Sequence, residues 1–169
     1  MRLFLFMLLV LVRFTVSAQP GKPAEADLDR LNFWVGEWKV SWSGGSGINR
    51  IEKTLNDRVI VEHFEITEGQ TKGFQGTSIS TFNPENGKWH QAWADNQGGY
   101  FNFLGESDGE NWIFKTPESQ KGANGNSYIF RMRFYRITHQ AFDWDWERSS
   151  DGGKTWELRW QIHYERKNG

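Results

Sequence analysis

The sequence predicts an all-β fold, a single antiparallel up-and-down barrel of about eight to ten strands. Two observations lead to this prediction. After a polar N-terminal stretch, the chain is a series of short runs of alternating apolar and polar residues, separated by Gly, Asn and Asp turns. The links between these runs are short, which favours consecutive hairpins. No long helical pattern, internal repeat or second domain stands out.

Three parts are expected along the chain. Residues 1–18 have a basic start, an apolar run from Leu3 to Val12 and a small-x-small end at Ala18. This is the pattern of a cleavable secretory signal peptide, and the run is too short to span a bilayer comfortably. Residues 19–30 are expected to form a polar tether and residues 31–167 the barrel. The predicted location is therefore secreted, either periplasmic or extracellular, with no transmembrane segment after cleavage.

Ten strands are expected within the barrel, and turn-forming residues separate them. Their predicted bounds are Phe33–Trp42, Ile48–Leu55, Val59–Ile66, Phe74–Phe82, Lys88–Ala94, Tyr100–Glu106, Trp112–Thr116, Ser127–Ile137, Ala141–Arg148 and Thr155–Arg166. One long polar loop, Pro117–Asn126, is expected to be mobile.

Alternation within the last strands predicts which side chains face inward. Aromatic and apolar residues share one face, and the residues expected on it are Phe142, Trp144, Trp146, Trp156, Leu158, Trp160, Ile162 and Tyr164. Keeping Arg131 and Arg133 outside requires an odd-length link or a bulge around Thr138–Gln140. The outward row Asp143, Asp145 and Glu147 could be taken for an acid–base site. Its two-residue spacing opposite arginines indicates cross-strand ion pairs instead.

The composition excludes several classes of function. The chain has no cysteine, which excludes thiolate catalysis, zinc–thiolate sites and iron–sulfur clusters. A formal net charge of -1 gives no electrostatic reason to expect a nucleic-acid partner. The 10 tryptophans and 13 phenylalanines indicate an aromatic-rich core. No metal-binding spacing links the four histidines.

The segment Leu31–Trp42 contains Gly36-Glu37-Trp38 at the start of the first strand. Because of this Gly-x-Trp motif, the chain resembles lipocalin-like (calycin) barrels. It is most similar to an uncharacterised bacterial group whose sequences open with Leu-x-Phe-x-x-Gly-x-Trp. The residues that carry the resemblance are Leu31, Phe33, Gly36, Trp38, Asp151, Gly152, Thr155, Trp156, Tyr164 and Arg166. The resemblance covers about residues 28 to 167. It implies a closed or nearly closed barrel whose interior can hold a small apolar ligand.

The same resemblance implies a role for Arg166. In lipocalins a basic residue near the end of the barrel packs over the motif tryptophan, so Gly36, Trp38 and Arg166 are expected to close the barrel through a cation–π contact. A more distant similarity to the haem-binding nitrobindins suggests His163 as an axial haem ligand. Against this, the nitrobindin opening Gly-x-Trp-x-Gly-x-Gly is not matched, and His163 alternates with the outward polar residues.

One further motif has a structural interpretation. Residues 149–156 match the Asp-box pattern Ser-x-Asp-x-Gly-x-Thr-Trp, which is found in glycosidase propellers. A propeller needs several copies, and this chain has one. We therefore expect Asp151 to stabilise a turn.

The interior aromatics remain as candidates for function. The residues expected to contact a ligand are Trp42, Trp89, Trp93, Phe134, Trp144, Trp146 and Trp160. Bulky aromatics can line a pocket for a flat or long apolar molecule, or they can fill the barrel completely. Three hypotheses follow: a non-enzymatic carrier of a small hydrophobic molecule without a cofactor, a haem-binding barrel that uses His163, and a filled-core accessory protein that acts through its surface. The sequence leaves the ligand and the oligomeric state open.

Overall fold

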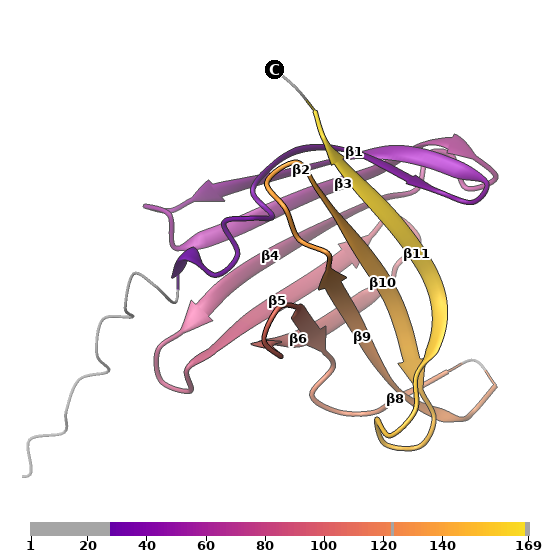
Figure 1. Cartoon of the computed structure of the whole chain (residues 1–169). Coiled ribbons are helices and arrows are strands. Elements are labelled where there is room, and N and C mark those ends of the chain that lie inside the picture. Colours follow the sequence, from indigo (N-terminus) through magenta and orange to yellow (C-terminus); the bar gives the residue numbers. More distant parts are fainter. Residues whose placement is uncertain (1–27, 123, 168–169) are drawn as a thin grey trace, which may run out of the picture.

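The computed structural model describes residues 28–122 and 124–167, which form a closed antiparallel barrel of ten strands with one additional short strand (Figure 1). The predicted signal peptide and most of the predicted tether lie outside the described residues. The strands are β1 (Gly36–Trp42), β2 (Gly45–Thr54), β3 (Val59–Gly69), β4 (Gln75–Asn83), β5 (Lys88–Asp95), β6 (Tyr100–Ser107), β7 (Trp112–Lys115), β8 (Gln120–Lys121), β9 (Ser127–Tyr135), β10 (Ala141–Ser149) and β11 (Glu157–Arg166).

The barrel closes because the first strand pairs with the last. Strand β1 pairs with both β2 and β11, and β11 continues through β10 to β9. On the other side the strands follow chain order from β2 to β7, and β7 pairs with β9. The all-β up-and-down prediction is confirmed. The loop Pro117–Asn126 differs from expectation, because β8 lies within it and pairs with the start of β9.

The connection between β9 and β10 has the predicted odd length. Tyr135 pairs with Asp143, and residues 136–140 form the link. Arg131 and Arg133 consequently lie outside, where their guanidinium groups contact Glu147 and Asp145 at 2.6 and 2.8 Å. The aromatic rows of both strands then face the interior together.

The predicted inward positions of Trp156 and Leu158 are wrong. The register between β10 and β11 shifts after the pair Trp146–Trp160, so Leu158 pairs with the outward Glu147. Leu158 is 50% exposed, and Trp156 lies outside beneath the guanidinium of Arg131. A one-residue bulge reverses the side of every residue beyond it.

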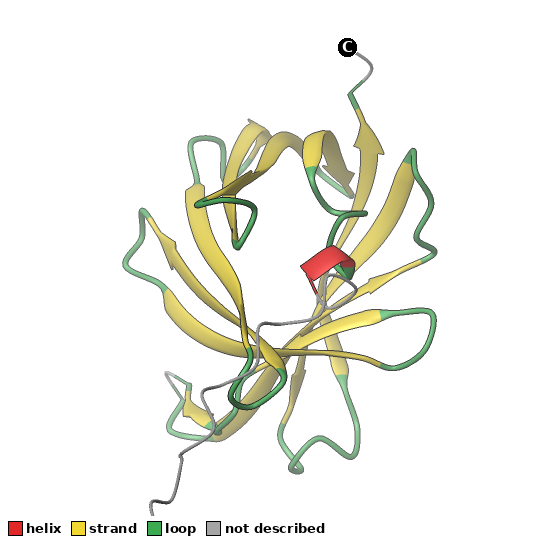
Figure 2. Cartoon of the chain, turned by 90° about the vertical axis from the view of Figure 1, so that its left-hand side faces the viewer, coloured by secondary structure: helices red, strands yellow, loops and turns green. Residues whose placement is uncertain are grey.

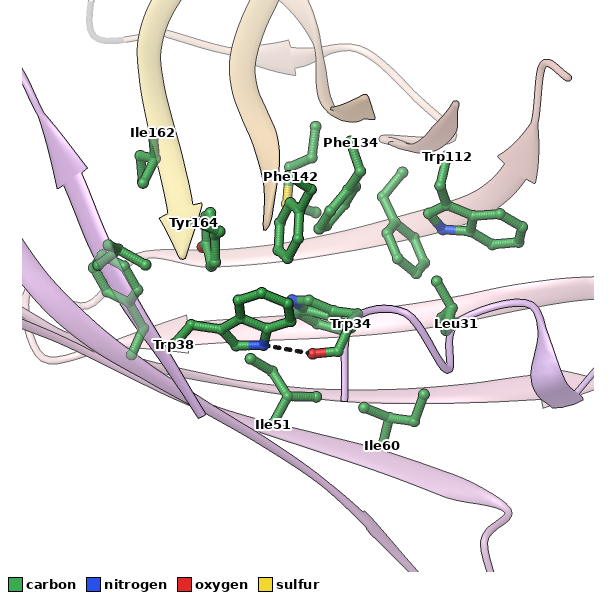
Figure 3. Close-up of a cluster of buried hydrophobic side chains, with 14 of the residues drawn as sticks. Leu31, Trp34, Trp38, Ile51, Ile60, Trp112, Phe134, Phe142, Ile162 and Tyr164 are labelled. Carbon is green, nitrogen blue, oxygen red and sulfur yellow. Dashed lines mark hydrogen bonds between the residues drawn. The ribbon is translucent and has the colours of Figure 1, made fainter. Parts of the chain in front are cut away.

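One end of the barrel is plugged by the segment that precedes β1. We call this the closed end. A short helical turn begins the described chain, and Figure 2 shows it (red) inside the outline of the barrel, to one side of the opening. Leu31 and Trp34, which follow it, are 0% and 1% exposed. Figure 3 shows them packed with Trp38, Ile51 and Phe134 in one apolar cluster. Within residues 28–122 and 124–167, no helix is long and apolar enough to cross a membrane.

Candidate functional site

The opposite end of the barrel contains a cavity of about 190 Å³, and we call this the open end. The cavity is lined by Phe64, Phe74, Trp93, Asp95, Phe101, Phe103, Met132, Trp144, Trp146, Trp160, Ile162 and Tyr164. Several of the aromatic rings are only partly buried, in contrast to Trp34, Trp38 and Phe142 of the closed end, which are each 1% exposed. The cavity is therefore an apolar interior space that is accessible from one end of the barrel.

Neighbouring aromatic rings hold the walls of the cavity in place. Trp144 and Trp146, two residues apart on β10, are stacked with ring centres 6.4 Å apart. Trp160 meets Trp144 edge to face at 5.9 Å, and Phe101 meets Trp146 at 5.4 Å. Pairs of this kind contribute about 0.5–1.5 kcal/mol each beyond the area they bury. The cavity is thus bounded by rings whose orientations are fixed by one another.

Glycines in the wall leave room for the tryptophans to lie flat against it. A Cβ atom on Gly76 would overlap the indole of Trp93, and one on Gly45 would lie 2.6 Å from that of Trp42. Asp95 adds a polar restraint, because its carboxylate accepts hydrogen bonds from Trp93 Nε1 at 3.2 Å and from the Gly99 amide at 2.8 Å. These contacts keep the large indoles beside the interior space.

The structure separates the predicted ligand-binding residues into three groups. Trp93, Trp144, Trp146 and Trp160 line the cavity. Trp42 packs on Trp160 at 5.1 Å without lining it. Trp89 and Phe134 are 1% exposed and belong to the buried core, where Phe134 packs on the plug residue Trp34. Sequence reasoning did not select Phe64, Phe74, Phe101, Phe103 and Tyr164 as ligand contacts. Tyr164 was expected to face inward, and alternation could have identified the four phenylalanines as inward as well.

A second feature that sequence reasoning missed is a polar layer inside the barrel. We define it as Asn49, Glu62, Ser78, Ser80, Gln91 and the hydroxyl of Tyr164. Each of these residues is no more than 7% exposed. Glu62 sits in the row Ile60, Glu62, Phe64 and Ile66 of β3, so the available signal was a single carboxylate in an otherwise apolar row.

Hydrogen bonds connect most of this polar layer. Asn49 Nδ2 donates to Glu62 Oε1 at 2.7 Å and to the Tyr164 hydroxyl at 3.2 Å. Ser78 donates to Glu62 Oε2 at 2.6 Å. Desolvation raises the pKa of Glu62 above its usual value, although the bonds from Ser78 and Asn49 oppose the shift. Burial and the nearby Glu62 raise the pKa of Tyr164, which therefore keeps its proton.

The closed end is fastened by Arg166. Its guanidinium carbon lies 4.1 Å from the ring centre of Trp38. Nη1 donates to the carbonyl of Val35 at 2.9 Å and Nη2 to that of Phe33 at 3.2 Å, while Trp38 Nε1 donates to the carbonyl of Trp34 at 2.8 Å. These bonds tie the plug segment to both the first and the last strand.

His163 lies outside the barrel. Its side chain is 52% exposed, and Nδ1 is 2.9 Å from Asp143 Oδ1 on the neighbouring strand. The cavity lining contains no histidine. His163 therefore does not fit the position of an axial ligand for a haem held inside the barrel. Among the described residues, no group of three or more His, Asp or Glu side chains is arranged to hold a metal ion.

The carboxylates on the outer face and the Asp box both stabilise the folded structure. Asp145 is 3% exposed, and its carboxylate is bonded by Arg133, Tyr135 and Gln161. At the tip between β10 and β11, Asp151 accepts bonds from the amide and hydroxyl of Thr155 at 3.0 and 2.6 Å. The Thr155 bonds lower the pKa of Asp151 well below its usual value. Both arrangements leave the carboxylates engaged in cross-strand pairing or in a turn.

No protein-family model matches the chain, and no curated protein matches it significantly.

Proposed function

We propose that this protein is a secreted, non-enzymatic carrier or sensor that binds a small hydrophobic molecule in the open-end cavity. The observation that supports it most strongly is the contrast between the two ends of the barrel. Apolar side chains fill the closed end, whereas the open end keeps about 190 Å³ of space between aromatic rings. An apolar cavity of roughly 150 Å³ is large enough to bind benzene.

The lining sets the size and shape of the ligand. Twelve residues enclose the space, and only Asp95 among them carries a charge. Ligand sites are typically apolar with a few polar groups that fix orientation. The volume suits a molecule of one or two rings, or the apolar end of a longer molecule that projects through the open end. Flat rings suit this lining because they can pack against the indoles of Trp93, Trp144 and Trp160.

Native mass spectrometry of the protein produced with its full sequence tests the proposal. We expect an extra mass that is retained under native conditions and lost on denaturation. Met132→Trp places a larger side chain in the cavity wall and should abolish the extra mass. Leu158→Trp adds the same ring on the outer surface, where residue 158 is 50% exposed, and should preserve it.

Two results would contradict a carrier function. One is a bare mass from repeated preparations, together with no uptake of added indole. The other is an equal loss of the extra mass in both variants, because the ligand would then not occupy this cavity. Either result would favour the remaining hypothesis, a barrel that acts through its surface.

A further inference from the structure

One aromatic ring of the cavity lining is carried by a loop. Of the described residues that line the cavity, Phe74 alone lies outside the strands, in the connection between β3 and β4. Strand β3 runs from Ile60 in the filled core to Phe64 at the cavity, so the connection that follows it lies at the open end. Phe74 packs edge to face on Phe64, with ring centres 6.3 Å apart. Its ring therefore borders the cavity on the side that is open.

The loop that carries Phe74 is exposed and is flanked by glycines. Residues 70–72 are all exposed. Gly69 and Gly73 on either side have φ values of +105° and +88°, a conformation that glycine adopts readily. A Cβ on Gly73 would meet nothing within 4 Å, so glycine is required there for the backbone conformation and not for space. Loop positions of this kind can absorb the change in backbone angles when a loop swings.

The loop is held to β3 by its backbone. Gly73 N donates to the carbonyl of Ile66, and Ile66 N donates to the carbonyl of Phe74, both at 2.9 Å. These two bonds continue the pairing of β3 with β4, and they make this the fixed side of the loop.

On the side of β5 the loop is held by the side chain of Asn96, in the turn between β5 and β6. Asn96 Nδ2 donates to the carbonyl of Gly73 at 2.8 Å, and Oδ1 accepts from the amide of Gln75 at 3.2 Å. The turn itself has other bonds, because Asp95 Oδ1 accepts from the amides of Gln97 and Gly99 at 3.0 and 2.8 Å. Loss of the Asn96 side chain would therefore release the loop without removing the bonds that shape the turn.

The contacts of Asn96 lie beside the cavity but outside it. Its neighbour Asp95 lines the cavity, and Asp95 pairs with Gly76 close to Phe74. The lining contains neither Asn96 nor Gly73, so their bond does not touch a ligand in the cavity. The same bond can form whether the cavity is empty or occupied.

Resting on the proposed function, we propose that the β3–β4 loop is a gate to the cavity, with Phe74 as its moving part and Asn96 as the latch. With the latch closed, the ring of Phe74 narrows the open end beside Asp95. Release of the two side-chain bonds of Asn96 lets the loop pivot on its bonds to Ile66 and carry the ring away. Because the latch is the same in the empty and the occupied protein, it controls the rates of ligand entry and exit and leaves the affinity almost unchanged.

Asn96→Ala tests the latch with 2-phenylethanol as the probe. Loss of two hydrogen bonds should raise the association and dissociation rate constants by about tenfold each, with Kd changed by less than about twofold. Fluorine NMR line shapes, recorded during a titration of the full chain labelled with 5-fluorotryptophan, give the dissociation rate constant and Kd together.

Asn86→Ala is the matched control. Asn86 Oδ1 accepts from the amide of Lys88 at 3.1 Å in the turn between β4 and β5, at the opposite end of the barrel. This variant loses a comparable side chain from a turn, and it should leave the dissociation rate constant and Kd unchanged.

Phe74→Ala separates the latch from a general effect of Asn96 on the fold. Without the ring the open end stays wide, so this variant should itself release the ligand faster. In the Phe74→Ala background the latch has no ring to hold, and Asn96→Ala should change the dissociation rate constant by less than about twofold.

Three outcomes would overturn the gate. The first is an unchanged dissociation rate constant in Asn96→Ala, and the second is an equally large increase in the Phe74→Ala background. In both cases the carrier proposal stands. The third is the absence of binding to the unmodified protein by either 2-phenylethanol or indole, in which case the carrier proposal fails and the gate fails with it.

Discussion

Gly36→Ala tests whether the close approach of Arg166 holds the barrel shut. Gly36 has a φ of +141°, a conformation that residues with a Cβ rarely adopt, and a Cβ there would overlap Arg166 Nη1. The strained backbone costs about 1–3 kcal/mol. Displacing the guanidinium removes a cation–π contact of about 0.5–2 kcal/mol. It also weakens the bonds to Phe33 and Val35, which add about 1–3 kcal/mol.

The total expected loss is about 2.5–8 kcal/mol, of which about 1.5–5 kcal/mol comes from Arg166. A double-mutant cycle with Arg166→Met separates the two parts. In the Arg166→Met background, Gly36→Ala should cost only the backbone strain, which gives a coupling energy of about 1.5–5 kcal/mol. Equilibrium unfolding in urea, followed by tryptophan fluorescence, provides all four free energies.

Additivity would refute this account. If the two costs add within about 0.5 kcal/mol, the methyl group does not displace the guanidinium, and Gly36 is required only for its backbone conformation. A small total loss, below about 1 kcal/mol, would also contradict the φ argument.

Three other predictions concern stability. Because burial raises the pKa of Glu62 in the folded state, ionisation of this carboxyl should lower the free energy of unfolding as pH rises above about 4.5. Glu62→Gln removes the ionisation, so the variant should gain stability relative to the unmodified protein between about pH 4 and pH 8. Urea unfolding over this pH range measures the difference. The pKa of Asp151 is lowered in the folded state, so this carboxylate stabilises the turn above its unfolded-state pKa, and the stabilisation is lost as pH falls below that value. Asp151→Ala should therefore speed amide hydrogen exchange at the tip between β10 and β11 at pH 7. An unchanged exchange rate would contradict the role of Asp151 in the turn. Arg133→Ala leaves the carboxylate of Asp145 partly unpaired and should lower the free energy of unfolding in urea by about 3 kcal/mol or more. Arg159→Ala breaks an exposed contact with Glu157 and should leave the free energy of unfolding almost unchanged.

The fold could be predicted because two local signals recur along the chain. Alternation identified the inward rows of β9 and β10, and the requirement that Arg131 and Arg133 stay outside predicted the odd link between them. The bulge after Trp146 could not be foreseen, since one extra residue in β11 has no clear signature in the pattern. It moved Trp156 and Leu158 to the outer face.

The site was predicted only in part, for a different reason. Alternation reports the side of a strand but not the height along the barrel axis. Trp89 and Trp93 therefore looked equivalent, although one is fully buried and the other lines the cavity. The plug segment around Trp34 decides which end is filled, and its position depends on contacts between residues far apart in sequence. The polar layer was missed because four of its residues, Asn49, Ser78, Ser80 and Gln91, look ordinary on their own strands. The one signal, the carboxylate of Glu62 in an apolar row, does not show by itself which polar groups it meets.

The most direct test of the central claim is fluorine NMR of protein labelled with 5-fluorotryptophan, titrated with 2-phenylethanol. The 10 tryptophans sample every region of the barrel, and single Trp→Phe variants assign the signals. On addition of 2-phenylethanol, we expect the fluorine chemical shifts of the cavity residues to change, namely those of Trp93, Trp144, Trp146 and Trp160. The chemical shifts of the core residues should stay the same, namely those of Trp34, Trp38, Trp89 and Trp112. Shifts confined to the outer Trp156, or spread over the filled core, would contradict a ligand site at the open end.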